Sequence, residues 1–149
     1  MRVVYTGGTF DLFHIGHIEL LEYCASLGDK VVVSLNKDDF VKRYKGEYPI
    51  IPYNERREML LATKYVDEVI SNIGGENSRM AILNSGANII VIGIDWLEKD
   101  YCKQMGFTPE WLSRNEIILC YVPRTKNIST TILKQKFKEA GSRRADERG

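Results

Sequence analysis

The chain has 149 residues, of which 44% are hydrophobic and 28% are charged, a balance typical of one compact globular domain. Its 21 basic and 20 acidic side chains leave a formal net charge of +1, which excludes the strongly basic surface of a general nucleic-acid binder. No apolar run reaches the roughly 18 residues that a membrane span needs, and the N-terminus has the pattern of a strand and not of a signal peptide. We therefore expect a cytoplasmic protein with neither a nucleic-acid nor a membrane partner.

The three cysteines, Cys24, Cys102 and Cys120, indicate neither a disulfide framework nor a zinc site, because their number is odd and no two form a close CxxC pair. Cys24 lies in a helical pattern and Cys120 in a strand pattern. Both are interpreted as core thiols of a protein in a reducing compartment.

Short apolar runs rich in β-branched residues alternate with segments whose apolar residues recur at helical spacing, and each pattern predicts an element. In chain order, the sequence predicts a strand over 2–6, a helix over 17–27, a strand over 30–35, an irregular connection over 36–52, a helix over 54–63, a strand over 68–72, a helix over 78–85, strands over 89–92 and 117–122, and a helix over 130–138. Gly7 and Gly8 should end the first strand, and Asn54 is the expected N-cap of the second helix.

This alternation predicts an α/β fold: a Rossmann-like, doubly wound parallel five-stranded sheet with helices on both faces. We expect one domain over residues 1–140, followed by a disordered charged tail over 141–149. The aromatic segment 101–115 is interpreted either as a lid or acceptor-specificity element or as a plain surface helix packed on the sheet. Ligands of such sheets bind beyond the carboxyl ends of the strands, so functional residues are expected there.

Residues 7–17 (GGTFDLFHIGH) directly follow the first predicted strand. The two glycines allow a tight turn and a close approach of a ligand to the backbone. His14 and His17 are the only histidines, and their spacing at the start of a helix puts both rings on one side. A helix N-terminus attracts anions, and imidazole donors there can hold a phosphate and stabilise charge on a reacting phosphorus. Such a pair can also cap a helix or bind a metal, but the glycines, the strand and the following helix favour a phosphate site.

The stretch GGTFDLFHIGH closely resembles the signature of the cytidylyltransferases of the HxGH nucleotidyltransferase superfamily, and the glycerol-3-phosphate enzymes are the most similar. Residues 124–131 (RTKNISTT) resemble the family's RTxGISTT motif, with Asn127 where glycine is usual. Residues 65–69 (YVDEV) match a run typical of the family, and residues 93–96 (GIDW) resemble its GxDW segment. The resemblance covers roughly residues 3 to 138, with the motifs in the family's order.

This resemblance implies a role for each matching residue. The implied catalytic residues are His14, His17, Lys45 and Arg124. The implied nucleotide-binding residues are Gly8, Thr9, Phe10, Gly16, Gly93, Asp95, Arg124, Ile128, Ser129 and Thr130. The implied acceptor-binding residues are Asp11, Arg43, Arg56 and Trp96. Asp11 can support the site directly or through the order of its loop, and Trp96 is equally compatible with a core position.

The implied reaction is attack by a substrate phosphate oxygen on the α-phosphorus of CTP with release of pyrophosphate, and glycerol 3-phosphate is the best candidate acceptor. Phosphoethanolamine, phosphocholine, a sugar phosphate and a phosphonate are alternative acceptors. An ATP-using enzyme of the FAD synthetase type is a second reading, and a non-catalytic nucleotide sensor is a third. Mg²⁺ is the expected cofactor, bound through phosphates and not by protein ligands. The resemblance also implies a homodimer.

Overall fold

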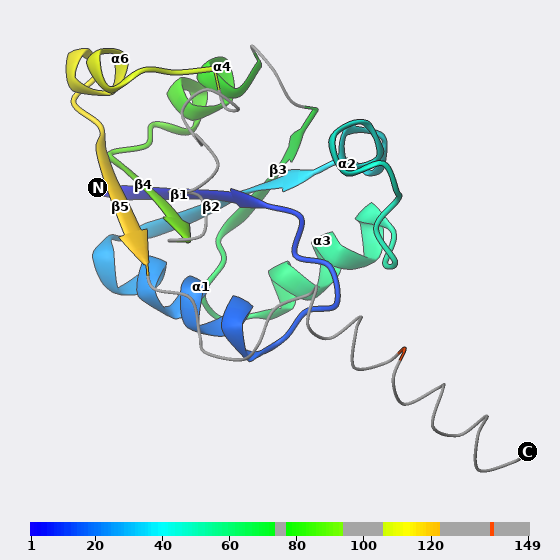
Figure 1. Ribbon diagram of the computed structural model, residues 1–149. Coiled ribbons are helices and arrows are strands. Elements are labelled where there is room, and N and C mark those ends of the chain that lie inside the picture. Colours follow the sequence, from blue (N-terminus) through cyan, green and yellow to red (C-terminus); the bar gives the residue numbers. More distant parts are fainter. Residues whose placement is uncertain (74–76, 94–105, 123–137, 139–149) are drawn as a thin grey trace, which may run out of the picture.

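The computed structural model describes residues 1–73, 77–93, 106–122 and 138. The described residues form a five-stranded sheet in the order β3-β2-β1-β4-β5 (Figure 1), in which each neighbouring pair is parallel. The strands are β1 (Val3–Gly8), β2 (Lys30–Asn36), β3 (Glu68–Asn72), β4 (Ile89–Gly93) and β5 (Ile118–Val122). Because the strand order reverses between β1 and β4, the topological switch point lies beside the loop that follows β1. The predicted α/β sheet is confirmed.

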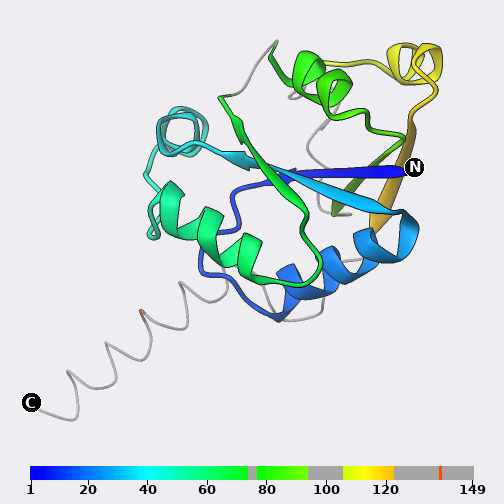
Figure 2. The same cartoon turned by 180° about the vertical axis from the view of Figure 1, so that it is seen from behind.

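Helices cover both faces of the sheet, as Figures 1 and 2 show from opposite sides. One face packs against α1 (Ile15–Leu27) and α3 (Tyr53–Ala62), and the other packs against α4 (Asn77–Ser85) and α6 (Pro109–Arg114). The core of the first face includes Leu21, Cys24 and Leu60, and that of the second includes Ile82, Phe107 and Leu112. Among the described residues, no helix combines the length and the apolar character that a bilayer crossing requires.

The structure corrects two predictions at the ends of elements. Gly7 and Gly8 do not end β1 but belong to it, because they pair with Ser34 and Leu35 of β2. Asn54 is not the N-cap of α3, whose N-cap is Pro52 and lacks a side-chain hydrogen bond. The loop after β1 therefore begins at residue 9, two residues later than expected.

The segment predicted to be an irregular connection contains a further helix, α2 (Asp38–Lys45). Phe40, Val41 and Tyr44 of this helix recur at helical spacing, but it has only eight residues, five of them charged, and only Val41 is buried, so the pattern is short and weakly apolar. Gly46 ends it in the left-handed conformation (φ +84°), and its N–H donates to the carbonyl of Lys42. Helix α2 directly follows β2 and therefore stands at the carboxyl edge of the sheet (Figure 1).

The described part of the aromatic segment 101–115 favours the packed helix over the lid. Phe107 is 3% exposed, and its ring stacks on that of Trp111 with a centroid distance of 5.9 Å. Leu112 is also buried in the same core cluster. Residues 101–105 of this segment lie outside the described ranges.

Candidate active site

The loop after β1 is held in a strained shape by its own buried side chains. Phe10 and Leu12 have positive φ angles of 52° and 49°, which bulky residues rarely adopt. Phe10 is buried in the core beneath α1. The buried carboxylate of Asp11 accepts hydrogen bonds from the backbone N–H groups of Ile50 (2.8 Å) and Ile51 (2.9 Å). Backbone strain of this kind persists only where the surroundings over-determine it, and it clusters at functional sites.

These bonds bear on the two roles expected for Asp11, which are contact with the acceptor and support through the order of its loop. The residue is 3% exposed, and its carboxylate accepts hydrogen bonds from backbone amides, including that of Leu12. The alternative reading, that Asp11 acts through an ordered loop, is the one this geometry favours.

The two histidines cap α1 with one ring nitrogen each. His14 is the N-cap, and its Nδ1 accepts from the N–H of Gly16 at 3.0 Å. His17 Nδ1 accepts from the N–H of His14 at 3.1 Å, which completes a reciprocal capping box. A neutral imidazole whose Nδ1 accepts a hydrogen bond carries its proton on Nε2. The capping bonds therefore fix both neutral rings as Nε2–H donors at the positive end of the helix dipole.

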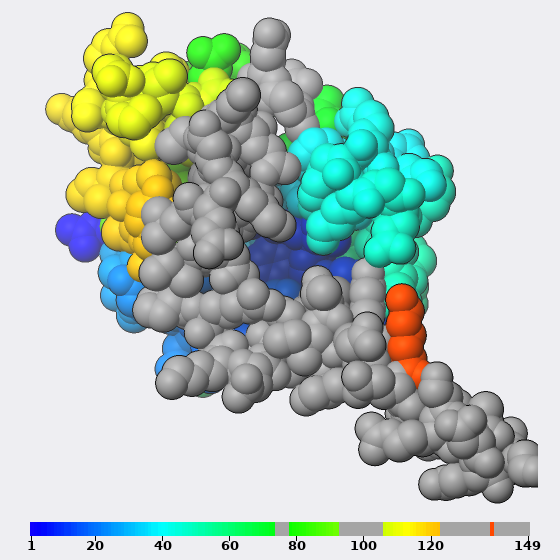
Figure 3. All heavy atoms as spheres, in the orientation of Figure 1, coloured from blue at the N-terminus to red at the C-terminus, as the bar shows by residue number. Residues whose placement is uncertain are grey.

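The expectation that the rings share one side is confirmed, since their centroids lie 3.9 Å apart. The reading of this pair as helix caps is equally correct, because the capping nitrogens and the donor nitrogens are different atoms of the same rings. In Figure 3 the blue N-terminal segment lies deep in a hollow beside the cyan α2 region.

His17 is enclosed by aromatic rings, which keep it neutral. Phe10 lies 5.2 Å and Phe13 5.3 Å from its ring centre, and the Phe13 ring is nearly parallel to it. Burial, and next the proximity of His14, lower the pKa of His17 to about 3, while Asp11 acts in the opposite direction. His17 is therefore a neutral hydrogen-bond donor throughout the physiological pH range.

The low pKa of His17 predicts a specific pH dependence of stability. Between pH 6.5, the ordinary pKa, and about pH 3, the folded value, the unfolded chain binds more protons at this residue than the folded chain does. The free energy of unfolding must therefore fall as the pH is lowered through this window. In denaturant titrations from pH 6.5 to 4.5, we expect a smaller loss of stability for His17→Gln, whose amide oxygen can still cap, than for the wild type. Equal losses in both proteins would contradict this account of His17.

Arg56 is completely buried and joins four segments around the site. Its Nη1 donates to the carbonyls of Thr9 (2.7 Å) and Asn36 (3.0 Å), and its Nε donates to the carbonyl of Ile51 (2.8 Å). Its Nη2 forms an ion pair with Asp38 at the start of α2. With 0% of its surface exposed, Arg56 does not fit the predicted contact with the acceptor, and instead it positions the loop that carries Thr9.

The predicted cations of α2 lie at its carboxyl end, on a helix and not in a loop. Lys45 is exposed at the last residue of α2, and its Nζ lies 5.7 Å from the ring centre of Tyr44. Arg43 donates from Nη2 to the carbonyl of Ile73 at 2.8 Å, so its guanidinium points toward the end of β3. These positions are compatible with phosphate binding, and the roles of both residues stay predictions.

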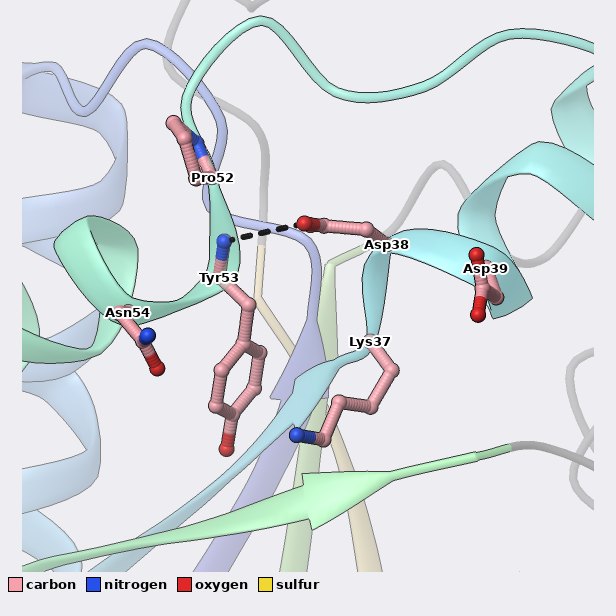
Figure 4. A pocket seen from close by; sticks show the side chains of 6 residues that line it. All are labelled: Lys37, Asp38, Asp39, Pro52, Tyr53 and Asn54. Atoms are coloured by element: carbon pink, nitrogen blue, oxygen red, sulfur yellow. Dashed lines mark hydrogen bonds between the residues drawn. The ribbon is translucent and has the colours of Figure 1, made fainter.

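Among the described residues, α2 contributes to the lining of two clefts. One of about 320 Å³ is lined by Lys37, Asp38, Asp39, Pro52, Tyr53 and Asn54 (Figure 4). The other, of about 530 Å³, is lined by Lys37, Asp39, Phe40, Arg43 and Ile73. Lys37 lines both, with Nζ 4.1 Å from the centre of the Tyr53 ring. The linings of these two clefts contain no residue of the glycine loop and neither histidine.

A family model described as cytidylyltransferase-like matches residues 5–136 of the chain. The chain belongs to this family. It is 37% identical over 139 residues to the glycerol-3-phosphate cytidylyltransferase of Bacillus subtilis (strain 168), covering 92% of this chain and 98% of that protein. The glycerol-3-phosphate cytidylyltransferase of Staphylococcus aureus is 37% identical over 140 residues, with 92% and 96% covered. The FAD synthase of Pyrococcus abyssi is 41% identical over 95 residues, which are 64% of each chain.

The fold of this cytidylyltransferase-like chain is shared with solved structures. A lipopolysaccharide core biosynthesis protein from Thermoplasma volcanium superimposes with a TM-score of 0.65 at 27% identity, covering 85% of this chain and 98% of that one. Since relatives matched over almost their whole length are named cytidylyltransferases, the chain is a nucleotidyltransferase enzyme.

Several residues predicted for the site of this cytidylyltransferase-like chain lie outside the described ranges. They are Asp95, Trp96, Arg124, Ile128, Ser129 and Thr130. Gly93 is described and ends β4, paired with Val122 of β5, at the carboxyl edge where ligands bind. Gly8, Thr9 and Gly16 lie at the end of β1, in its loop and in the first turn of α1.

Within the part of this cytidylyltransferase-like chain that the structure describes, no three His, Cys, Asp or Glu side chains form a potential metal-binding group. The donors gathered at the histidine pair are N–H groups, which suit anions and not cations. A metal ion would therefore fit this site as part of a metal–nucleotide complex. That the protein supplies no metal ligand of its own stays a prediction.

Sequence reasoning missed three polar residues around the glycine loop: Asn36, Asp38 and Tyr44. Asn36 is the polar residue that ends the apolar run of β2. Because ligands of a parallel sheet bind beyond the carboxyl ends of its strands, this position could have identified Asn36 as a site residue. Asp38 and Tyr44 gave no such signal, because their partners, Arg56 and Thr9, are distant in sequence.

Proposed function

We propose that the chain transfers CMP from CTP to a small phosphorylated acceptor and releases pyrophosphate, with glycerol 3-phosphate as the favoured acceptor. The observation that carries the proposal is the pair of imidazoles 3.9 Å apart at the N-terminus of α1, each with Nδ1 engaged in capping. Their Nε2–H groups and the helix dipole together favour a phosphate beside the switch point. The choice of CTP and of glycerol 3-phosphate is supported by the named enzymes that share most of the chain's length.

In the proposed reaction an acceptor phosphate oxygen attacks the α-phosphorus of CTP in line with the leaving group. A new P–O bond forms, the bond from the α-phosphorus to the bridging oxygen breaks, and the electron pair leaves with pyrophosphate. No covalent enzyme intermediate is required, so the protein contributes positioning and charge stabilisation. His14 and His17 donate to the α and β phosphates where negative charge increases.

The remaining predicted residues complete this proposal. Lys45 and Arg124 neutralise phosphate charge, and Ser129 and Thr130 bind the β and γ phosphates. Mg²⁺ enters as the metal–nucleotide substrate, because phosphate oxygens are its usual ligands, and it offsets charge on the triphosphate. A homodimer and a cytoplasmic location belong to the same proposal.

A second candidate function is adenylyl transfer from ATP, as in an FAD synthase. It is favoured by the 41% identity to the Pyrococcus abyssi FAD synthase over 95 residues. That match covers 64% of this chain, whereas the cytidylyltransferases match 92%. Because the cytidylyltransferases match more of the chain than the FAD synthase does, CTP is the favoured nucleotide.

A pyrophosphate-release assay tests the proposal. The protein is incubated with Mg²⁺, with CTP or ATP, and with glycerol 3-phosphate, phosphoethanolamine, phosphocholine, a sugar phosphate, a phosphonate or FMN in separate reactions. We expect release to require CTP and to be fastest with glycerol 3-phosphate. Faster release with ATP and FMN would move the assignment to the second candidate. Calorimetric binding of a nucleotide without release for any pair would favour the non-catalytic sensor, and the absence of both release and binding would contradict all three functions.

A further inference from the structure

Tyr44 connects α2 to the glycine loop through a compact set of hydrogen bonds. Its hydroxyl lies 3.0 Å from Thr9 Oγ1 and 3.3 Å from Asn36 Nδ2. Asn36 Nδ2 also donates to Thr9 Oγ1 at 3.0 Å. These three residues come from the last turn of α2, the loop after β1 and the end of β2. The half-buried phenol of Tyr44 therefore connects the last turn of α2 to the loop that is proposed to bind phosphate.

A hydrogen bond from Asn72 fixes the orientation of the Asn36 side-chain amide. Asn36 is 6% exposed, and its Oδ1 accepts from Asn72 Nδ2 at 2.9 Å. The neighbouring strand thus determines that Nδ2, and not the oxygen, faces the two hydroxyls. Asn36 is a donor to both Thr9 and Tyr44 in this arrangement.

The hydrogen-bond inventory of the set leaves one proton for a ligand. A hydroxyl has one proton and two acceptor sites. Between Thr9 and Tyr44 one hydroxyl donates to the other, so within this triad the proton of the accepting hydroxyl is not committed. One acceptor site also remains, on the hydroxyl that donates, but the uncommitted proton is what an anionic ligand can use. A phosphate oxygen is a ligand atom of this kind.

The ring of Tyr44 links the same bonds to the cations of α2. It packs on Phe40 with a centroid distance of 4.9 Å, and the Lys45 ammonium lies 5.7 Å from its centre. Lys45 follows Tyr44 directly in the chain, so the position of the phenol constrains where the lysine backbone stands. Movement of the Tyr44 hydroxyl would displace both Thr9 and the last turn of α2.

We propose that Tyr44 is a positioning residue for nucleotide binding, which acts through Thr9 and through the last turn of α2. This inference rests on the proposed function, because it assigns Tyr44 to the phosphate site that the histidine pair marks. It predicts that the Tyr44 hydroxyl contributes to the affinity for nucleotide more than to the chemical step.

The Tyr44→Phe variant tests the proposal, because it keeps the ring and its contacts and removes only the hydroxyl. We expect the Kd for Mg²⁺·CTP, measured by calorimetry, and the KM for CTP each to rise about five- to tenfold, as for the loss of one neutral hydrogen bond. The KM for the acceptor and kcat should change by less than about twofold. A merely structural role would lower the melting temperature and leave the Kd unchanged.

Two further variants make the test specific. Tyr48→Phe removes a hydroxyl from a tyrosine that is 57% exposed and lies four residues further on, and it should leave the Kd and KM unchanged. In a double-mutant cycle with Thr9→Val, Tyr44→Phe should have little additional effect on the Kd, since the two hydroxyls act as one unit. Additive effects would overturn the role through Thr9.

The outcomes separate this inference from the proposed function. If the wild type binds CTP and transfers CMP while Tyr44→Phe has the same Kd and KM, only the role of Tyr44 is overturned. If the wild type binds no nucleotide, the proposed function is contradicted and this inference falls with it. A rise in Kd for Tyr44→Phe but not for Tyr48→Phe supports it.

Discussion

Replacement of His14 by alanine is expected to lower kcat by on the order of a hundredfold or more, the typical cost of removing a preorganised donor to transition-state charge. His14 is the N-cap of α1, and its Nδ1 accepts from the N–H of Gly16. The same bond directs the ring proton to Nε2, where it can meet a phosphate. Steady-state rates of pyrophosphate release with saturating CTP and acceptor provide the measurement.

A second variant separates catalysis from helix capping. Alanine also removes the cap, which typically costs about 1 kcal/mol of stability. His14→Asn keeps a good capping side chain but cannot place a donor where His14 Nε2 lies. We therefore expect His14→Asn to retain the melting temperature better than His14→Ala and to lose kcat to a similar extent. Turnover near the wild-type rate in either variant would contradict the proposed role of His14.

Replacement of Arg56 by methionine is expected to destabilise the fold by about 3–5 kcal/mol, the cost typical of breaking a buried charged network at one partner. The guanidinium is 0% exposed and donates to the carbonyls of Thr9, Asn36 and Ile51. Methionine fills much of the volume but leaves these carbonyls without that donor. The Asp38 side chain is 37% exposed, so the larger part of the loss comes from the three carbonyls and not from the ion pair.

The neighbouring arginine offers a matched control for this prediction. Arg57 is exposed, and Arg57→Met should change the free energy of unfolding by less than about 0.5 kcal/mol. Arg56→Lys retains the charge but cannot reach three carbonyls and a carboxylate together, so an intermediate loss is expected. Denaturant titrations of the three variants give the values. Equal stability of Arg56→Met and Arg57→Met would show that the buried network contributes little.

Local patterns determined most of the fold. The strand patterns were correct because burial on both faces of a parallel strand produces continuous apolar runs, as in Lys30–Asn36, where every residue after Lys30 is buried. The spacing of His14 and His17 was equally informative, since the geometry of one helical turn fixes the separation of residues three apart. The sequence also placed the glycine loop at the switch point, because alternating strands and helices imply a parallel sheet with ligands at its carboxyl edge.

The exceptions were a short, highly charged helix and a glycine pair. Helix α2 has a single buried residue, and the glycine pair at the end of β1 is extended because β2 pairs with it. In both places tertiary contacts outweigh the local preference.

What only the tertiary structure decided is the role of each polar side chain around the site. Asp11 and Arg56 have charged side chains of the kind that bind ligands. Their partners nevertheless include backbone groups 39 and 47 residues away in the chain. Tyr44 meets Thr9 across 35 residues. A charged or hydroxyl side chain satisfies its hydrogen bonds with whichever segment the fold brings beside it, and the penalty for burying it unpaired makes that choice obligatory. Sequence spacing therefore located the histidine pair, whereas the folded chain alone determined which neighbours position it.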